Sequence, residues 1–356
     1  MDRDVTLLIG RDEGLFSLTS KDGGLDWSPS EIQLPDTEVH VIKAAPDGTV
    51  YLGTRGHGLF RSKSGMHGWE AIETPAAAAR IRSIVPAGDH LIIGTEAGLG
   101  EGASPVGVFA WSQKSGWEPL GDLRTCSGSG AWSYPVPTEG VHARWVSVDP
   151  RRQERVYAAI QVGGIAITDD NGETWTDRRD LDSLDVHMIE PHPSRPGVVY
   201  AGAGGRASGF YRSKDFGDTW EVLAPDCGSF VVQFALHPTD PNCIYLGAAR
   251  GHAQDWTKPE TGRGRGEIFR SDDGGDTWRK LGGGLPELME SRIHALYVDP
   301  ENPETLYFGG GLPAAQRNAG IARDAGVYQS LDAGDSWRQI MAMEKGEPLA
   351  LLAVWS

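Results

Sequence analysis

Five ionisable side chains occupy the same position of a recurring segment, six residues before a proline. They are His40, Arg80, Arg144, His187 and His294. Guanidinium groups bind carboxylate, sulfate or phosphate through forked donors, and an imidazole that titrates near neutral pH can transfer protons. If the fold brings these segments together, the residue types predict a site that binds a small anion and acts on it by acid–base chemistry.

The segments that carry these residues have the composition of β-strands, and each begins one repeat of a longer pattern. They read EVHVIKAAP, ARIRSIVP, HARWVSVDP, DVHMIEPHP, FVVQFALHP and RIHALYVDP. A second strand follows each of them, as in TVYLGT and CIYLGA, and a third strand, as in GFYRS, leads into a turn. Alternate residues of a strand share one face. We therefore expect the ionisable position to lie on the same face as the mostly apolar position two residues later.

The turn after each third strand recurs seven times along the chain. Five copies are nearly complete and read SKDGGLDW, TDDNGETW, SKDFGDTW, SDDGGDTW and SLDAGDSW. Two are degenerate, SKSGMHGW from Ser62 to Trp69 and the shortened SQKSGW from Ser112 to Trp117. The Asp is expected to accept hydrogen bonds from turn amides, the Gly two residues later permits a positive φ, and the Trp offers a large apolar surface for packing.

This turn resembles the Asp-box, or BNR, repeat of sialidases, sortilin-type receptors, xyloglucanases and photosystem II assembly factors. The resemblance implies an all-β fold, a single seven-bladed β-propeller of four-stranded blades over residues 1–356. The N-terminal repeat lacks its first strand, and LALLAVWS at 349–356 matches the missing one. We therefore expect the C-terminal strand to pair with the N-terminal blade and to close the ring. The relatives differ in function, so the resemblance predicts the scaffold alone.

In such a propeller the first strand of each blade would line the central channel, and the loops between second and third strands would surround its mouth. Three of these loops are long, at 95–107, 249–266 and 309–326. Long loops on one face are typical of a functional site. We expect His187, His294 and His40 to be catalytic and a set of loop and strand residues to bind substrate, namely Arg80, Arg144, Arg55, His57, Gln161, Arg206, His252 and Trp256.

Two functional hypotheses follow from this constellation. The first is an enzyme, a hydrolase or lyase, acting without a cofactor on a small anionic molecule at the mouth of the channel. A variant of it has His40, His187 and His294 holding one divalent metal ion, which two nearby guanidinium groups would disfavour. The second is a non-catalytic propeller whose long-loop face recognises a peptide or protein partner. A structural interpretation stays open beside them, in which the five side chains plug the channel and hydrogen-bond to loop carbonyls.

True sialidase activity is not expected. Sialidases carry an Arg-Ile-Pro segment near the N-terminus and a Tyr–Glu nucleophile pair. The nearest string here is Arg80-Ile81-Arg82, and no Tyr occupies the recurring position.

The charge balance limits the partners of the protein. The formal net charge of −16 repels phosphate backbones and anionic lipid, so we expect neither nucleic acid nor membranes as partners. The chain enters a strand-like segment almost at its start, which leaves no room for a signal peptide. Three cysteines, Cys126, Cys227 and Cys243, lack metal-ligand spacing and are expected to be free thiols. These features favour a cytoplasmic location.

Overall fold

A computed structural model describes residues 3–99, 104–134, 140–205, 209–223, 226–250, 253, 256, 258, 263–312, 322–344 and 346–356. The described residues form β-strands joined by turns, with short 3-10 helices and no α-helix. The predicted all-β class is therefore confirmed. No helix among these residues is long and apolar enough to cross a membrane.

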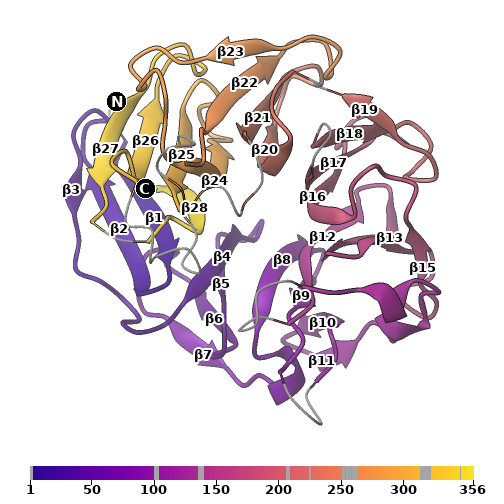
Figure 1. Cartoon of the computed structure of the whole chain (residues 1–356). Coiled ribbons are helices and arrows are strands. Elements are labelled where there is room, and N and C mark those ends of the chain that lie inside the picture. Colours follow the sequence, from indigo (N-terminus) through magenta and orange to yellow (C-terminus); the bar gives the residue numbers. More distant parts are fainter. Residues whose placement is uncertain are drawn as a thin grey trace. The chain divides into compact units, whose positions relative to one another are not determined.

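The chain divides into two compact units, and each is described by itself. Unit 1 comprises residues 1–39, 205–210 and 222–356, and unit 2 comprises residues 40–204 and 211–221. Most strands belong to four-stranded sheets in which consecutive strands are hydrogen-bonded neighbours. Figure 1 labels these strands along the chain. Where the opposing residues of two described strands are known, the strands are antiparallel, for example β12 with β13 and β24 with β25. The expected blades of four strands are present in this sense.

The strands of unit 1 belong to three arrangements. The first has the order β28-β1-β2-β3 and contains β1 (Val5–Arg11), β2 (Gly14–Ser20), β3 (Ser28–Pro29) and β28 (Ala350–Trp355). The second contains β20 (Phe230–Leu236), β21 (Ile244–Ala249), β22 (Glu267–Ser271) and β23 (Arg279–Leu281). The third contains β24 (Arg292–Val298), β25 (Leu306–Gly311), β26 (Gly326–Ser330) and β27 (Arg338–Ala342).

The strands of unit 2 follow the same order. The first set is β4 (Val39–Ala44), β5 (Val50–Thr54), β6 (Leu59–Ser62) and β7 (Glu70–Ile72), and the second is β8 (Ile81–Ala87), β9 (His90–Thr95), β10 (Val108–Ser112) and β11 (Gly116–Pro119). The third is β12 (His142–Asp149), β13 (Arg152–Gln161), β14 (Gly164–Thr168) and β15 (Thr176–Arg178). The last comprises β16 (Asp185–Pro191), β17 (Val199–Gly204) and most of β18 (Phe210–Ser213), whereas β19 (Glu221–Leu223) has only its first residue in unit 2. Short 3-10 helices η1 (Ala76–Ala78), η2 (Leu123–Thr125) and η3 (Ser129–Ala131) lie between the sheets of this unit.

The chain ends meet in one sheet of unit 1. Strand β28 pairs antiparallel with β1, from Val5 opposite Trp355 to Gly10 opposite Ala350 (Figure 1). Leu351 and Ala353 of β28 join Leu7 and Ile9 in one buried apolar cluster. The C-terminal segment thus supplies the strand that the N-terminal repeat lacks, as the sequence predicts.

The recurring turns are held by the hydrogen bonds expected of their residues. In the turn after β18, the Ser213 hydroxyl donates to Asp215 Oδ1 at 2.7 Å and accepts from the Gly217 amide at 2.8 Å. The Thr219 amide and hydroxyl donate to the two carboxylate oxygens of Asp215 at 2.9 and 2.6 Å. The turns that begin at Thr168, Ser271 and Ser330 repeat this pattern. Gly217 has φ of 90°, which confirms the need for glycine there.

Both units have cores of alternating strand residues from neighbouring sheets. In unit 2, for example, Tyr157, Ile167, Ile189 and Tyr211 belong to one buried cluster. The three cysteines are buried free thiols, as predicted. The interior of each unit is therefore apolar between the sheets, while buried polar groups lie at the recurring turns and near the starts of strands such as β12 and β16.

Removal of residues 346–356 should destabilise the protein strongly. The truncation exposes the edge of β1, and it removes Glu347 from the buried Arg292 guanidinium. Loss of one partner of a buried ion pair costs about 3–5 kcal/mol, before the lost apolar burial is counted. We expect insoluble protein or a large fall in Tm. Deletion of the exposed Ser356 alone is the control, and a truncated chain that melts within about two degrees of the control would contradict the role of β28.

Acid should weaken the recurring turns. Hydrogen bonds from Thr219 and Ser213 outweigh the effect of burial and lower the pKa of Asp215 to about 2. This folded-state pKa lies below the unfolded value of about 3.9, so the carboxylate stabilises the fold above pH 4 and loses that effect as the pH falls towards 2. Asp215→Ala should cost about 1 kcal/mol at pH 7 and much less at pH 2 in urea unfolding. An equal cost at both pH values would contradict this account.

Candidate functional site

A β-bulge recurs near the start of the inner strands and fixes where the ionisable side chains stand. In five strands the register with the next strand shifts by one residue, which leaves one residue unpaired. These residues are Arg82, Arg144, His187, Val232 and His294. A bulge re-aims a side chain and is common beside functional sites. Four of the five bulged residues are thus cationic or ionisable.

The bulge corrects one residue equivalence predicted from the sequence. Counting from the proline places Arg80 at the recurring position, but the strand register places Arg82 there. The reason is that Pro86 lies within β8 and pairs with Leu91, whereas Pro238 and Pro300 follow the ends of their strands. Arg80 therefore stands two residues before the bulge, as His142 does in β12.

A buried carboxylate gathers three arginines at the start of β8. The Glu96 side chain has no exposed surface, and it accepts hydrogen bonds from Arg55 at 3.1 Å, from Arg82 at 2.8 Å and from Nη2 of Arg80. Burial alone would raise the pKa of Glu96, but the three guanidinium groups hold it well below its usual range. Glu96 is therefore permanently ionised, and it anchors this arginine cluster of Arg55, Arg80, Arg82 and Glu96.

Arg80 is the most open member of the arginine cluster. Its side chain is 30% exposed, against 15% for Arg55 and 6% for Arg82. Nε of Arg80 is buried and has no hydrogen-bond partner among the residues that the structure describes. A partly exposed guanidinium group at the edge of a cationic cluster can bind an anion.

Hydrogen bonds continue from the arginine cluster along the starts of β12 and β16. The Gly140 amide donates to Glu96 at 3.2 Å, and the Gly140 carbonyl lies 2.8 Å from Nδ1 of His142. Nε2 of His142 lies 2.7 Å from Oε1 of Gln161, which also accepts from Arg144 at 2.8 Å. Burial, followed by the charges of Arg82 and Arg144, lowers the pKa of His142 far below its usual value and keeps the ring neutral.

The network ends at an Asp–His pair in β16. Nε2 of His187 lies 3.2 Å from Oδ1 of Asp185, whose side chain is 26% exposed. Burial would raise the pKa of Asp185, but His187, Arg144 and a hydrogen bond from Gln161 lower it. The structure thus connects Arg80, Arg144, Gln161 and His187 of the predicted site in one polar network within unit 2.

The remaining predicted residues lie in other surroundings. His40 contacts Nη1 of Arg82 at 3.2 Å and so borders the arginine cluster. His57 is exposed on the loop after β5. Trp256 is fully buried in unit 1, where it packs on Phe230 and lies under the Arg292 guanidinium, so it acts as a core residue. Arg206 and His252 lie outside the described residues.

Unit 1 contains a second buried ion pair at an equivalent place. Arg292 donates to both oxygens of Glu347 at 3.0 and 2.7 Å, and Nδ1 of His294 lies 2.9 Å from Glu347. Burial opposes ionisation of Glu347, but Arg292 and His294 hold its pKa well below the usual range. His294 therefore stands beside a carboxylate of this chain, as His187 does. No group of three His, Cys, Asp or Glu residues in the described parts of the chain is placed to hold a metal.

Sequence reasoning missed the partners of the predicted side chains and a third polar group in unit 2. Nε1 of Trp145 donates to Glu190 at 3.0 Å, and Nζ of Lys43 lies 5.0 Å from the centre of the Trp145 indole. Burial lowers the pKa of Lys43 and raises that of Glu190, and each charge partly offsets the shift of the other. Lys43 and Glu190 are charged residues that directly follow an apolar residue inside their strands, Ile42 in β4 and Ile189 in β16, which is the signal that could have identified them.

Comparison with known proteins gives a fold and distant relatives. No protein-family profile matches the chain. Xyloglucanase Xgh74A of Acetivibrio thermocellus is 26% identical over 229 residues, which are 54% of this chain and 25% of the relative. The chain therefore spans about a quarter of the length of that relative.

Two solved structures resemble the chain. The GH74 enzyme of Niastella koreensis has a TM-score of 0.66 at 17% identity, over 85% of this chain and 45% of the enzyme. YCF48 bound to a D1 peptide has a TM-score of 0.57 at 16% identity, over 87% of this chain and 86% of YCF48. Both are β-propeller proteins, and the present chain has the β-propeller fold.

Loss of the Glu96 charge should destabilise unit 2. Glu96→Gln leaves the arginines without the carboxylate that they share, and breaking a buried ion pair costs about 3–5 kcal/mol. Urea unfolding measures the loss. Glu70→Gln is the control, because the Glu70 side chain is 61% exposed in its ion pair with Arg61 and should change stability by less than about 0.5 kcal/mol. Equal effects of the two variants would show that Glu96 does not anchor the cluster.

Proposed function

We propose that this chain is a β-propeller hydrolase that acts on a small glycan with an anionic group, and that Arg80 binds this group. The observation that carries the proposal is the state of Arg80. Its guanidinium is partly exposed and stands beside two further guanidinium groups on one buried carboxylate. An anion bound at the exposed part of the Arg80 guanidinium would reduce the repulsion among the three cations.

The substrate class and the reaction type are supported by the relatives. The curated relative is a xyloglucanase, an enzyme that takes a glycan, and the chain matches about a quarter of it. Neutral xyloglucan offers no anionic group for Arg80. We therefore propose an acidic sugar, such as a uronate or a sulfated sugar, as the substrate.

Proton transfer is assigned to His187. The Asp185 carboxylate lies 3.2 Å from Nε2 of the buried His187 and would stabilise the imidazolium that forms when His187 takes a proton, which suits a general base. In hydrolysis His187 takes a proton from water as the water oxygen bonds to the anomeric carbon. The bond between that carbon and the glycosidic oxygen breaks, and the glycosidic oxygen takes a proton from solvent as it leaves. The same base acting on a carbon-bound proton beside a carboxylate would give elimination, which is the lyase alternative.

Several finer features belong to this proposal. We propose that the four-stranded sheets form one seven-bladed ring, that the Ser-x-Asp turns are Asp-box repeats, and that the long-loop face surrounds the channel mouth. The reaction would need no cofactor. A cytoplasmic location remains a prediction from the sequence.

A second candidate function is the non-catalytic recognition of a peptide. The YCF48 structure that resembles this chain contains a D1 peptide, and the two chains match over 87% and 86% of their lengths. The match to the xyloglucanase covers a much smaller share of that protein. A terminal or side-chain carboxylate of a peptide would satisfy the same Arg80 donors.

Binding and turnover together test the proposal. Galacturonate, glucuronate, glucose 6-sulfate and a peptide with a free C-terminus are titrated by calorimetry, and acidic oligosaccharides are assayed for new reducing ends. Arg80→Ala should weaken binding of the acidic sugar about tenfold or more, since a charge-assisted hydrogen bond contributes about 1.5–3 kcal/mol. His187→Ala should abolish turnover while the acidic sugar still binds.

Arg178→Ala is the matched control for Arg80→Ala. The Arg178 side chain is also 30% exposed and is paired with one carboxylate, Asp218, but it lies on the outer strand β15. Its substitution should leave binding unchanged. Binding of an acidic ligand without turnover would favour the peptide-type function, and equal effects of the two arginine variants would overturn the anion site.

A further inference from the structure

The shortened turn between β10 and β11 departs from the five complete turns. Residues Ser112 to Trp117 have Lys114 in place of the aspartate and lack two residues before the tryptophan. The hydroxyls of Ser112 and Ser115 hydrogen-bond to each other at 2.8 Å, and the Ser115 amide donates to the Ser112 hydroxyl at 3.0 Å. This smaller turn replaces the carboxylate-centred one.

The shortened turn leaves space where a complete turn makes contact. In the complete turn after β14, a Cβ on Gly172 would lie 2.7 Å from backbone atoms of Leu120, which follows the outer strand of the preceding sheet. A Cβ on Gly116, the equivalent glycine, would meet nothing within 4 Å. In both turns the tryptophan donates a hydrogen bond to the segment that follows the sheet before it, Trp175 to the Leu120 carbonyl and Trp117 to the Glu73 carbonyl, each at 2.8 Å. The sheet of β8 to β11 is therefore held to the sheet of β4 to β7 beside an open groove.

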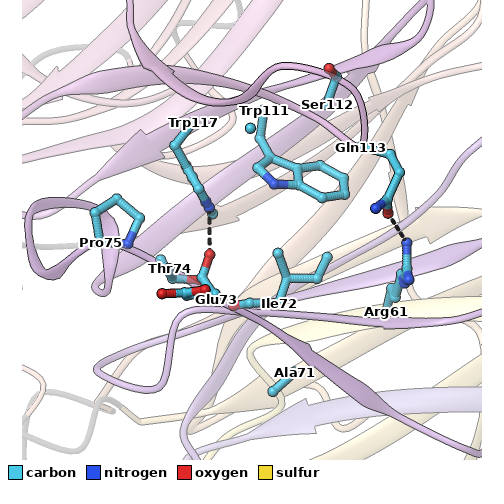
Figure 2. A pocket seen from close by; sticks show the side chains of 11 residues that line it. Arg61, Ala71, Ile72, Glu73, Thr74, Pro75, Trp111, Ser112, Gln113 and Trp117 are labelled. Atoms are coloured by element: carbon cyan, nitrogen blue, oxygen red, sulfur yellow. Dashed lines mark hydrogen bonds between the residues drawn. The ribbon is translucent and has the colours of Figure 1, made fainter.

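The groove has a volume of about 630 Å³ and is lined by aromatic and polar side chains of β6, β7, β10 and the shortened turn. Figure 2 shows the Trp111 indole between Trp117 and Gln113, with Ile72 below it. The two indole rings are 6.4 Å apart and inclined by 52°. Arg61 donates to the Gln113 side chain and is paired with Glu70 at 3.1 Å.

We propose that this groove is a second carbohydrate site, which binds a neutral sugar ring. The choice of a carbohydrate as the ligand rests on the proposed function. Ligand sites of about 300–1,000 Å³ typically combine aromatic walls with a few polar groups, as this one does. Trp111 is buried in the core, so the partly exposed Trp117 offers the indole against which a sugar ring can lay its C–H face. The sugar hydroxyls can hydrogen-bond to an amide or guanidinium group. Glu70 neutralises Arg61, and Glu73 also lines the groove, so the groove, unlike the arginine cluster, has no cationic excess that would select an anion.

The test uses neutral probes, cellobiose and a xyloglucan heptasaccharide, with tryptophan fluorescence and calorimetry as readouts. Gln113→Ala removes an exposed amide that lines the groove, and it should weaken binding of the heptasaccharide about tenfold. Lys114→Ala, which alters the exposed neighbour outside the lining, is the matched control and should change nothing. Insertion of Asp and Thr between Gly116 and Trp117, together with Lys114→Asp, restores the length of a complete turn and should abolish binding.

The outcomes separate this proposal from the proposed function. If the neutral probes do not bind, or bind equally to all variants, the groove proposal is overturned, whatever the acidic sugars do. If the neutral probes bind and depend on Gln113 while acidic sugars ignore Arg80→Ala, the groove stands and the anion site fails. A thermal melt of each variant, expected within about two degrees of the parent protein for Gln113→Ala, shows that lost binding is not lost folding.

Discussion

A charged side chain that folding removes from water must find an opposite charge or enough hydrogen bonds, and this constraint organises the starts of the inner strands. Glu96 supplies the opposite charge for three arginines in unit 2, and Glu347 supplies it for Arg292 and His294 in unit 1. The bulge in each strand makes the pairing geometrically feasible, because it turns one side chain out of the regular alternation. Partner carboxylates come from the next strand or the chain end, so the charges also join elements far apart in the sequence.

The strands and turns of the fold were predictable because each repeat carries the same residue types at the same positions. An aspartate that can accept from turn amides and a glycine with positive φ require the same turn wherever they recur, as at Asp215 and Gly217. The match of 349–356 to the inner strands predicted the partner of β1 for the same reason. The sequence assigned Arg80 to the recurring position, and this assignment was wrong because Pro86 lies inside β8. A proline usually marks the end of a strand, but the backbone pairing decides the register.

The site was predictable in residue types and much less in geometry. Period-two alternation predicted which side chains share a face, but a bulge shifts that alternation by one residue, and no sequence signal marked it. The partners were missed because they stand elsewhere in the repeat. Glu96 follows a second strand, while Asp185 precedes the bulge by two residues. Glu96 follows an apolar strand, whereas Asp185 lies close to Asp182 and Glu190 in the sequence, and the identity of both as partners emerges only from the three-dimensional arrangement.

The pairing constraint also limits which groups can transfer protons. Glu96 and Glu347 are held ionised by their cations, and the turn aspartates are held ionised by hydroxyls and amides, so none of these carboxyl groups can donate a proton near neutral pH. Glu190 differs, because burial raises its pKa while its neighbour Lys43 has a lowered one. Burial thus dominates the pKa of Glu190, whereas cations or hydrogen-bond donors dominate the pKa of Glu96, Glu347 and the turn aspartates. The pairing constraint therefore leaves the four-stranded sheets with carboxylates that bind and position cations, and it leaves proton transfer near neutral pH to imidazoles such as that of His187.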